Sequence, residues 1–187
     1  IAHFLRKNKF NFTLGGNIGT PILDLKISKN SYVIIEASSF QLSHSQFIKP
    51  NFAFFLNFSN DHLDWHGNMV NYLNSKLKIF KLQNSNDYAF LNKKFKKTFK
   101  RRNFLGKLII PQLNHYKKVK SKIKNNYLTS NINEENMSYV YAFSKILKIK
   151  NKSFINAMNT FKGLPHRFET FYRKKNVIFV NDSKATS

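Results

Sequence analysis

Apolar residues in this chain fall into short continuous runs and into longer stretches with helical spacing. The short runs predict β-strands near residues 10–14, 32–35, 51–57, 87–91 and 108–110. Helical spacing predicts helices at residues 68–83, 134–148 and 151–162. Because the strand runs are continuous rather than alternating, we expect strands that are buried on both faces, as in a parallel sheet. The expected fold class is therefore α/β, with a mostly parallel sheet flanked by helices.

A glycine-rich segment interrupts the pattern after the first strand. Residues 15–19 read Gly-Gly-Asn-Ile-Gly and precede Thr20-Pro21, which predicts a tight turn that opens a helix. The free N–H groups at a helix start favour anions. The segment is not a Walker A loop, which would need Gly-Lys followed by Ser or Thr, and taken alone it is a weak signal for phosphate binding.

The pattern is weakest in the lysine-rich residues 93–130, which predict only one strand. Helical spacing ends at the Gly-Leu-Pro of residues 163–165. Beyond this break, residues 167–172 and 177–180 predict the two strands of a hairpin. The chain begins with Ile1 and breaks off without a tail, so we expect an internal fragment of a longer protein.

Composition and charge limit the classes of function. A hydrophobic content of 42% is ordinary for a packed core. The net charge of +23 makes a basic nucleic-acid-binding module a rival function. Because the charge is spread along the chain, as an AT-rich coding bias would spread it, we expect no nucleic-acid partner. No apolar run reaches the roughly 18 residues of a membrane span, so we expect a cytoplasmic protein with no membrane partner. The absence of cysteine excludes disulfides and thiolate metal sites.

Candidate chemistry gathers where two predicted strands end. Glu36 ends one strand, and Asp61-His62 follow the next. Because ligands bind beyond the carboxyl ends of parallel strands, we expect these side chains to be neighbours. A carboxylate and an imidazole suit Mg²⁺ or Mn²⁺. The alternative is that Glu36 caps a helix and His62 is an ordinary loop histidine. Ser38-Ser39 offer hydroxyl donors, with helix capping as the alternative role.

Lys76 lies on the apolar stripe of the helix predicted at residues 68–83, whereas Lys78 and Lys81 point elsewhere. A lysine that faces inward is costly unless it is paired, deprotonated or modified. One account is that the side chain extends until its ammonium reaches the sheet edge. The other is that a neutral amine captures carbon dioxide as a carbamate, which offers two oxygens to a magnesium ion.

The loop at residues 61–67 reads Asp-His-Leu-Asp-Trp-His-Gly and holds two of the nine acids and two of the six histidines. His62 is the residue that we expect to bind a metal. The residues that we expect to shape or support the loop are Asp61, Asp64 and His66. The simplest role for Trp65 is burial of the loop.

Five motifs, in order along the chain, resemble those of the Mur ligases. They are GGNIGTP at 15–21, VIIEASSFQL at 33–42, NFSNDHLDWHGNMVNYLNSKLKIF at 57–80, GLPHRFE at 163–169 and NDSKATS at 181–187. The resemblance covers nearly the whole chain. Within the family, SSFQL and NDSKAT point to the member that adds D-glutamate to UDP-N-acetylmuramoyl-L-alanine.

The resemblance implies an ATP-dependent amide-bond-forming ligase of peptidoglycan precursor synthesis. A substrate carboxylate would accept the γ-phosphoryl group, and the amine of D-glutamate would attack the resulting acyl phosphate. Two Mg²⁺ ions suit this chemistry, because charge builds up on the phosphoryl oxygens. By resemblance, Glu36, His62 and Lys76 are metal ligands, Lys76 is carbamylated, and Lys76 and His62 are catalytic. Asn17, Ser38 and His62 would contact the muramoyl substrate.

Further motif residues match positions of the family that bind the nucleotide and the amino acid. Asn133 and Asn136 match a His-Asn-x-x-Asn pattern near the adenine, although Ile132 replaces the histidine. The other matched nucleotide contacts are His166, Arg167, Asp182 and Lys184. Thr186 resembles a contact to D-glutamate. An alternative for Arg167 is an ion pair with Glu169 across the hairpin.

The resemblance also implies a division into domains. Residues 1–162 would be the central ATP-binding domain without its N-terminal P-loop segment, and residues 163–187 would start a Rossmann-like C-terminal domain. We expect the fragment alone to be inactive and the full-length protein to be a monomer. The enzyme alternatives are another Mur-type ligase and a folylpolyglutamate synthase.

Overall fold

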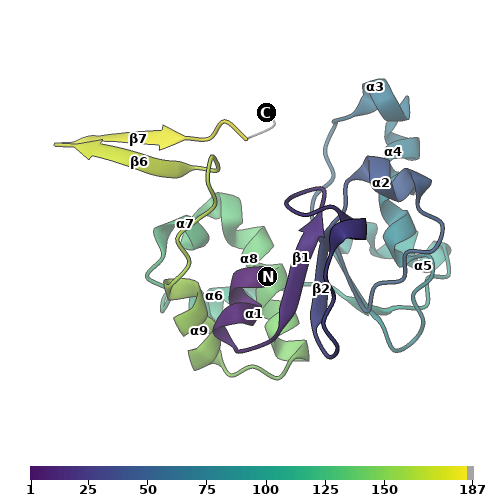
Figure 1. Ribbon diagram of the computed structural model, residues 1–187, viewed down its shortest axis with the longest axis horizontal. Coiled ribbons are helices and arrows are strands. Elements are labelled where there is room, and N and C mark those ends of the chain that lie inside the picture. The colour runs from purple at the N-terminus through teal and green to yellow at the C-terminus, as the bar shows by residue number, and fades with distance from the viewer. Residues whose placement is uncertain (185–187) are drawn as a thin grey trace.

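The computed structural model describes residues 1–184 and has the expected α/β class (Figure 1). Its parallel strands are β1 (Phe12–Gly16), β2 (Tyr32–Glu36), β3 (Phe52–Phe55), β4 (Tyr88–Leu91) and β5 (Lys107–Ile109). β1 pairs with β2, and β3, β4 and β5 form a second ladder in that order. The rings of Tyr32 and Phe52 lie 6.4 Å apart, so β2 begins beside β3.

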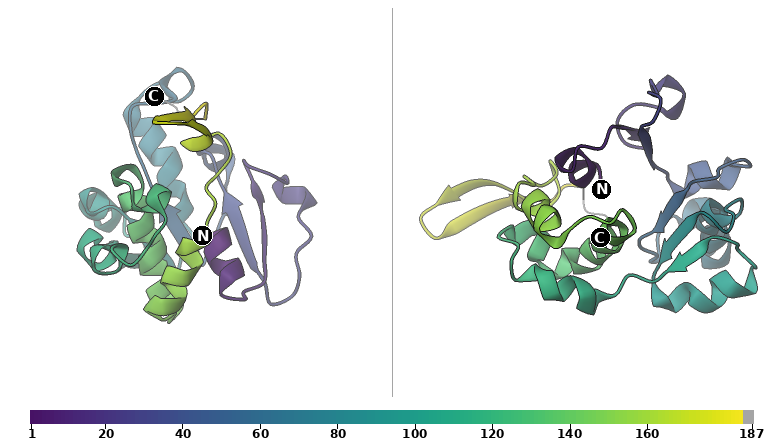
Figure 2. Two further views of the ribbon diagram at one scale, coloured as in Figure 1. Left: turned by 90° about the vertical axis from the view of Figure 1, so that its left-hand side faces the viewer. Right: turned by 90° about the horizontal axis from the view of Figure 1, so that it is seen from below.

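Helices cover both faces of the ladder that contains β3 (Figures 1 and 2). Those on one side are α1 (Ala2–Lys7), α6 (Leu113–Lys120), α7 (Asn126–Thr129), α8 (Asn131–Ile146) and α9 (Asn151–Asn159). Those on the other side are α2 (Ser39–His44), α4 (Met69–Leu77), η2 (Lys78–Phe80), η3 (Lys93–Phe95) and α5 (Lys96–Arg101). The short helix α3 (Leu63–His66) precedes α4.

The side chains of β3 show why this ladder has two cores. Phe52 and Phe54 pack against the cluster formed with α8 and α9, whereas Ala53 and Phe55 belong to the cluster formed with α4 and α5. Successive side chains of a strand point to opposite faces, so an uninterrupted apolar run fills both cores. The prediction of two-sided burial is confirmed for this strand.

The prediction of two-sided burial is wrong for β1 and β2. Tyr32 and Ile34 pack against the core, but Leu14, Val33 and Ile35 are 45%, 38% and 39% exposed. The described part of the chain therefore covers only one face of this pair. Continuous apolar runs indicate strands, but they do not show which faces a particular domain encloses.

The helix predicted after the glycine turn is also wrong. Among the described residues, only the short turn η1 (Ile22–Asp24) forms between β1 and β2. The chain folds back on β1 instead, because the Gly16 N–H donates to the Thr20 carbonyl at 2.9 Å. Residue Thr20 precedes a proline, which disfavours helical backbone there. The argument that a helix start at this turn binds anions therefore fails.

The remaining predicted elements are present with shifted ends. α4 and η2 fill the helix predicted at residues 68–83, and α8 begins three residues before the predicted position 134. The hairpin consists of β6 (Glu169–Lys174) and β7 (Val177–Asn181), which are antiparallel and extend away from the α/β core (Figure 1). No helix among the described residues is long and apolar enough to cross a membrane.

Candidate functional site

Glu36 lies at the carboxyl end of β2, directly opposite Gly16 of β1. Gly16 has a φ of +113°, and a Cβ on it would lie 2.4 Å from the Glu36 carbonyl oxygen. The next residue, Asn17, donates its backbone N–H to that carbonyl at 2.8 Å. Glycine is therefore needed here, because only its small size and free φ let Asn17 approach Glu36 so closely.

His62 is held in a constrained loop conformation after β3. Its φ is +56°, and its backbone N–H donates to Asp61 Oδ1 at 2.9 Å. Its Nε2 lies 3.5 Å from Asp61 Oδ2, and its ring meets the edge of the Phe40 ring at 5.0 Å. Left-handed backbone in a residue other than glycine is uncommon and gathers at functional sites. The imidazole is thus fixed by neighbours and remains partly open to solvent.

Lys76 reaches from α4 to the carboxyl end of β3. Its Nζ donates to the Asn57 carbonyl at 2.8 Å and to the Tyr72 hydroxyl at 3.4 Å. The same atom lies 5.5 Å from the centre of the Phe55 ring and 5.2 Å from that of Tyr72. The inward orientation predicted from the apolar stripe is confirmed. The amine also reaches the sheet edge, as the account of an extended side chain requires.

The surroundings of Lys76 act on its charge in opposite directions. Burial is the larger influence and lowers the pKa of its amine, while the carboxylates of Asp61 and Glu36 act to raise that pKa. Burial followed by the charge of Asp61 raises the pKa of the nearby Tyr72 hydroxyl. The ends of β2 and β3 therefore bring the carboxylates of Glu36 and Asp61 within electrostatic reach of the Lys76 amine.

The donor atoms at this edge fit a hard cation only in part. Within residues 1–184, no three His, Asp or Glu side chains lie close enough together to hold a metal ion. A cation there would need Glu36, His62 and further oxygens, such as those of a carbamylated Lys76 or of a phosphate. Glu36 does not cap α2, because the N-cap of that helix is Ser38. In the described structure the Glu36 carboxylate has no hydrogen bond or ion pair with another side chain.

Ser38 forms a capping box at the start of α2. Its hydroxyl accepts a hydrogen bond from the Gln41 N–H at 3.2 Å, and the Gln41 side chain accepts one from the Ser38 N–H at 3.0 Å. The capping alternative for this serine is therefore observed. Its predicted contact with a substrate stays a prediction, since a capping hydroxyl still has a second lone pair.

Trp65 does not bury the loop, so that interpretation is wrong. The residue is 49% exposed and lies against Phe40 and His44 of α2, with ring centres 5.4 Å and 5.6 Å away. His66 is the buried residue of the loop, with 6% exposure. On a four-residue helix only one face can point inward, and the imidazole occupies it.

Asn133 and Asn136 lie in the first turns of α8, three residues apart and so on one side of the helix. The Asn133 side chain donates to the Tyr127 carbonyl at 2.9 Å and to Ser130 Oγ at 3.3 Å. Asn136 is exposed, and Ile132, which replaces the expected histidine, is 75% exposed. Asn133 therefore ties α8 to α7, and Asn136 is free to meet a ligand.

A cavity of about 290 Å³ adjoins this part of α8 and was not predicted from the sequence. It is lined by Asn92, Pro111, Leu113, Glu135, Ser138 and Tyr139. Asn92 follows β4 and donates to Glu135 Oε1 at 2.6 Å, while Pro111 lies just beyond β5. Because ligands bind at the carboxyl ends of strands, the position of Asn92 after a predicted strand could have indicated this cavity. The residues of its opposite side could not be predicted, because the sequence after residue 92 has no clear apolar pattern.

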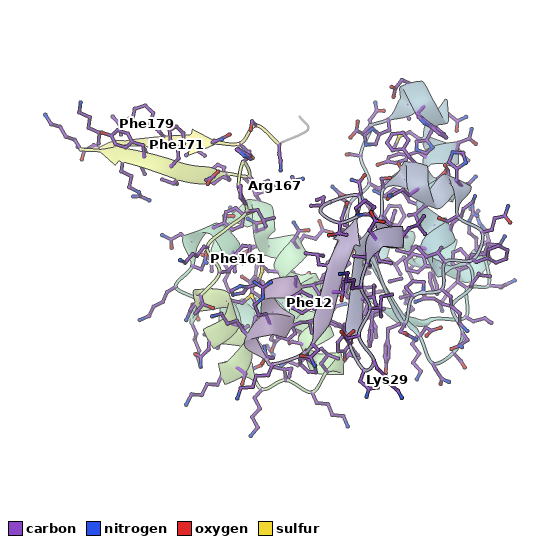
Figure 3. All side chains as sticks on the ribbon, in the orientation of Figure 1. Phe12, Lys29, Phe161, Arg167, Phe171 and Phe179 are labelled. Atoms are coloured by element: carbon purple, nitrogen blue, oxygen red, sulfur yellow. The ribbon has the colours of Figure 1, made fainter. Side chains whose placement is uncertain are left out.

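Polar residues at the base of the hairpin bond mainly to one another. Glu169 accepts the His166 N–H at 2.8 Å, and Asp182 accepts the Phe168 N–H at 2.9 Å. The alternative of an Arg167–Glu169 ion pair is not observed, and the Glu169 carboxylate accepts the backbone of His166 instead. Figure 3 shows Arg167 at this base.

The structure does not join the hairpin residues to the Lys76 group. In the described structure no hydrogen bond or ion pair links His166, Arg167, Asp182 or Lys184 to Glu36, His62 or Lys76. Lys184 donates its N–H to the His166 carbonyl at 3.0 Å, which closes the base of the hairpin. Thr186, the predicted contact to D-glutamate, lies outside the described residues.

The parallel sheet, its two helical layers and the polar groups at its carboxyl edge define an α/β domain with a candidate site at the strand ends. The family model described as Mur ligase middle domain matches residues 2–163. The chain therefore belongs to the Mur ligase family, through its middle domain.

Curated relatives support this assignment. Proteins named UDP-N-acetylmuramoylalanine--D-glutamate ligase from Rickettsia felis and Fervidobacterium nodosum are each 33% identical over 100% of this chain. The matches cover 46% and 44% of those relatives, so the chain spans about half of their length.

Solved structures show the same fold. A crystal structure of MurF from Acinetobacter baumannii superposes with a TM-score of 0.67 at 13% identity, and the match covers 97% of this chain and 46% of that one. MurF from Thermotoga maritima in complex with ADP superposes with a TM-score of 0.63 at 16% identity, covering 96% and 48%. At these identities the likeness concerns the fold alone.

Proposed function

We propose that the chain is part of an ATP-dependent ligase that joins D-glutamate to UDP-N-acetylmuramoyl-L-alanine in peptidoglycan precursor synthesis. The observation that carries the proposal is the convergence of Lys76, Glu36 and Asp61-His62 at the carboxyl edge of the sheet. The choice of D-glutamate is supported by the names of the relatives and by the motifs SSFQL and NDSKAT.

In this proposal Glu36, His62 and a carbamylated Lys76 hold two Mg²⁺ ions. Carbamate formation adds carbon dioxide to the neutral amine and releases one proton, which turns the uncharged amine into an anion with two oxygen ligands. The lowered pKa of Lys76 favours this step, because it enlarges the neutral fraction of the amine. Bound Mg²⁺ would neutralise the charge of the phosphoryl oxygens during transfer.

The other predicted residues would bind the substrates. Asn17 and Ser38 flank Glu36 and would contact the muramoyl substrate. ATP would lie against Asn133 and Asn136, near the cavity beside α8, and the C-terminal part of the chain would close over it. The residues proposed to contribute from that part are His166, Arg167, Asp182, Lys184 and Thr186. The full-length protein would act as a cytoplasmic monomer.

Phosphate release by the full-length gene product tests the proposal. With ATP, Mg²⁺ and UDP-N-acetylmuramoyl-L-alanine present, release is expected to depend on D-glutamate. Replacing D-glutamate by L-lysine or diaminopimelate, or the acceptor by a folate, is expected to abolish release. Equal rates with another amino acid or with the folate would contradict the proposed substrates. The 187-residue chain alone is expected to be inactive.

A further inference from the structure

The imidazole of His66 makes polar contacts with two helices besides its own. Its Nε2 lies 3.0 Å from the hydroxyl of Ser39 in α2, and its Nδ1 lies 3.5 Å from the hydroxyl of Ser75 in α4. All three residues are buried, with exposures of 6%, 6% and 9%. A single side chain at the end of α3 therefore connects α2, α3 and α4 through buried polar contacts.

The hydrogen bonds of this group run in one direction. The hydroxyl of Ser75 donates its single proton in a hydrogen bond to the carbonyl of Asn71, with Oγ at 3.0 Å from that oxygen. Ser75 can therefore only accept from His66, so the ring proton must lie on Nδ1. With one ring proton, placed on Nδ1, Nε2 is an acceptor and the hydroxyl of Ser39 donates to it. The arrangement selects the Nδ1–H tautomer of the neutral ring.

Apolar and backbone contacts hold the ring in the same place. The His66 ring stacks on Phe40 of α2, with centres 5.5 Å apart and planes at 20°, and lies 5.0 Å from the Tyr72 ring of α4. The Asn71 side chain donates to the His66 carbonyl at 3.1 Å. Both neighbouring helices are thus bound to this residue by an aromatic contact as well as by a hydrogen bond.

Each helix that His66 joins carries a residue of the proposed site beside the point of contact. Ser39 follows Ser38, and Ser75 precedes Lys76. Because adjacent residues of a helix move together, displacement of either contact would shift the neighbouring site residue. His62 lies four residues before His66, and its carbonyl accepts the His66 N–H at 3.0 Å.

We propose that His66 is a positioning residue whose imidazole, through Ser39 and Ser75, fixes Ser38, His62 and Lys76 relative to one another. The expected effect of His66 on turnover rests on the proposed function. Its expected effect on the position of the neighbouring residues does not. In this proposal, one buried ring aligns three segments that are separate in sequence. Side chains that hold binding residues in place typically change activity by about 10- to 100-fold when they are removed.

The matched variants are His66→Phe, which keeps a ring but loses both hydrogen bonds, and His66→Gln, which keeps a donor and an acceptor. Tyr116→Phe is the control, because it removes another buried hydrogen bond, from the Tyr116 hydroxyl to the Leu128 carbonyl at 3.2 Å. In the full-length protein, His66→Phe is expected to lower kcat at least about tenfold with a smaller change in KM for ATP. His66→Gln is expected to recover part of kcat, and Tyr116→Phe to leave it unchanged.

Nitrogen NMR of the histidine rings supplies a readout that does not require ligase activity. The parent is expected to show the Nδ1–H tautomer for His66, and His66→Phe is expected to shift the ring resonances of His62, whereas Tyr116→Phe is not. An Nε2–H tautomer in the parent, or unchanged His62 resonances together with parental kcat in His66→Phe, would overturn the inference. If the parent lacks D-glutamate-dependent activity, the proposed function fails while the NMR result still decides the role of His66.

Discussion

At the scale of single residues, Lys76 combines burial with a charge that nearby groups favour. The rings of Phe55 and Tyr72 attract its ammonium, and a cation near an aromatic face gains about 0.5–2 kcal/mol. Burial opposes this and lowers the pKa of the amine. Because burial is the larger influence on the pKa, the neutral form of Lys76 is more accessible than that of a solvent-exposed lysine. This balance suits a side chain that has to become a carbamate.

Replacing Lys76 tests its role against that of a neighbouring lysine. Lys76→Ala is expected to lower turnover of the full-length ligase by at least about 100-fold, the order of loss seen when one fixed electrostatic partner of a transition state is removed. The control is Lys78→Ala, because the Lys78 amine donates to the Ser43 carbonyl instead. Steady-state phosphate release measures both variants. Comparable turnover in Lys76→Ala and the parent would remove the carbamate from the proposed function.

Sequence pattern located Lys76 but not the details around it. Helical spacing alone places a residue on the inner face of α4, so this orientation could be predicted. The exposure of Trp65 and the burial of His66 could not, because both lie in the four-residue helix α3, which is too short to show a periodic pattern in the sequence. Which of two adjacent side chains turns inward there depends on the partners that the fold supplies, here Ser39 and Ser75.

At the scale of elements, the start of α2 combines a structural and a proposed binding role in Ser38. Ser38→Ala removes the cap and is expected to lower the free energy of unfolding by about 0.5–2 kcal/mol. Ser38→Asp is the matched variant, since an aspartate at this position can still accept the Gln41 N–H. Urea denaturation of the two variants and the parent measures the difference.

Turnover separates the two roles of Ser38. If the hydroxyl also contacts the muramoyl substrate, Ser38→Asp is expected to keep stability near that of the parent and to raise KM for UDP-N-acetylmuramoyl-L-alanine. A parental KM in Ser38→Asp would show that this serine acts only as a cap. Loss of stability equal to that of Ser38→Ala would instead contradict the capping argument.

The strands β3 and β4 could be predicted from the sequence, whereas the helix expected after the glycine turn was wrong. The glycine segment shows the reason for this difference. The apolar runs of β3 and β4 are each buried on both sides. A continuous apolar run is the pattern that such strands need, so the local sequence was enough to predict them. The segment between β1 and β2 has the proline and glycines of a helix start. Its backbone nevertheless pairs with β1 through Thr20, and this tertiary contact outweighs the weak local preference.

At the scale of the whole molecule, the hairpin β6–β7 differs from the rest of the chain. Its apolar residues Phe171 and Phe179 are 63% and 43% exposed, and Figure 3 shows both on the arm that extends from the core. Two strands without further cover are marginally stable at best.

The cavity beside α8 could not be predicted from the sequence, because its walls come from segments that only the folded chain brings together.

Among residues 1–184, the last ring that packs on the core is that of Phe161, which suits the predicted end of the first domain at residue 162. Its ring lies 5.2 Å from the ring of His3 and 6.0 Å from that of Tyr127, and Figure 3 places it on the core. The Phe161 carbonyl also accepts a hydrogen bond from the Asn125 side chain. Leu164, three residues later, is 50% exposed. In the part of the chain that the structure describes, no core-packing apolar residue follows Phe161.

Truncation after residue 162 tests this boundary. The side-chain hydrogen bonds found for the described residues 163–184 stay within that segment, so its removal breaks none of those in the core. Residues 1–162 are expected to unfold in one cooperative transition, with a urea midpoint close to that of the 187-residue chain. Truncation after residue 158 is the control, because it removes the partly buried Phe161 with its contacts to His3 and Tyr127 and is expected to lower the midpoint. A midpoint that falls equally in both truncations would place the boundary beyond residue 162, since the core would then need the hairpin.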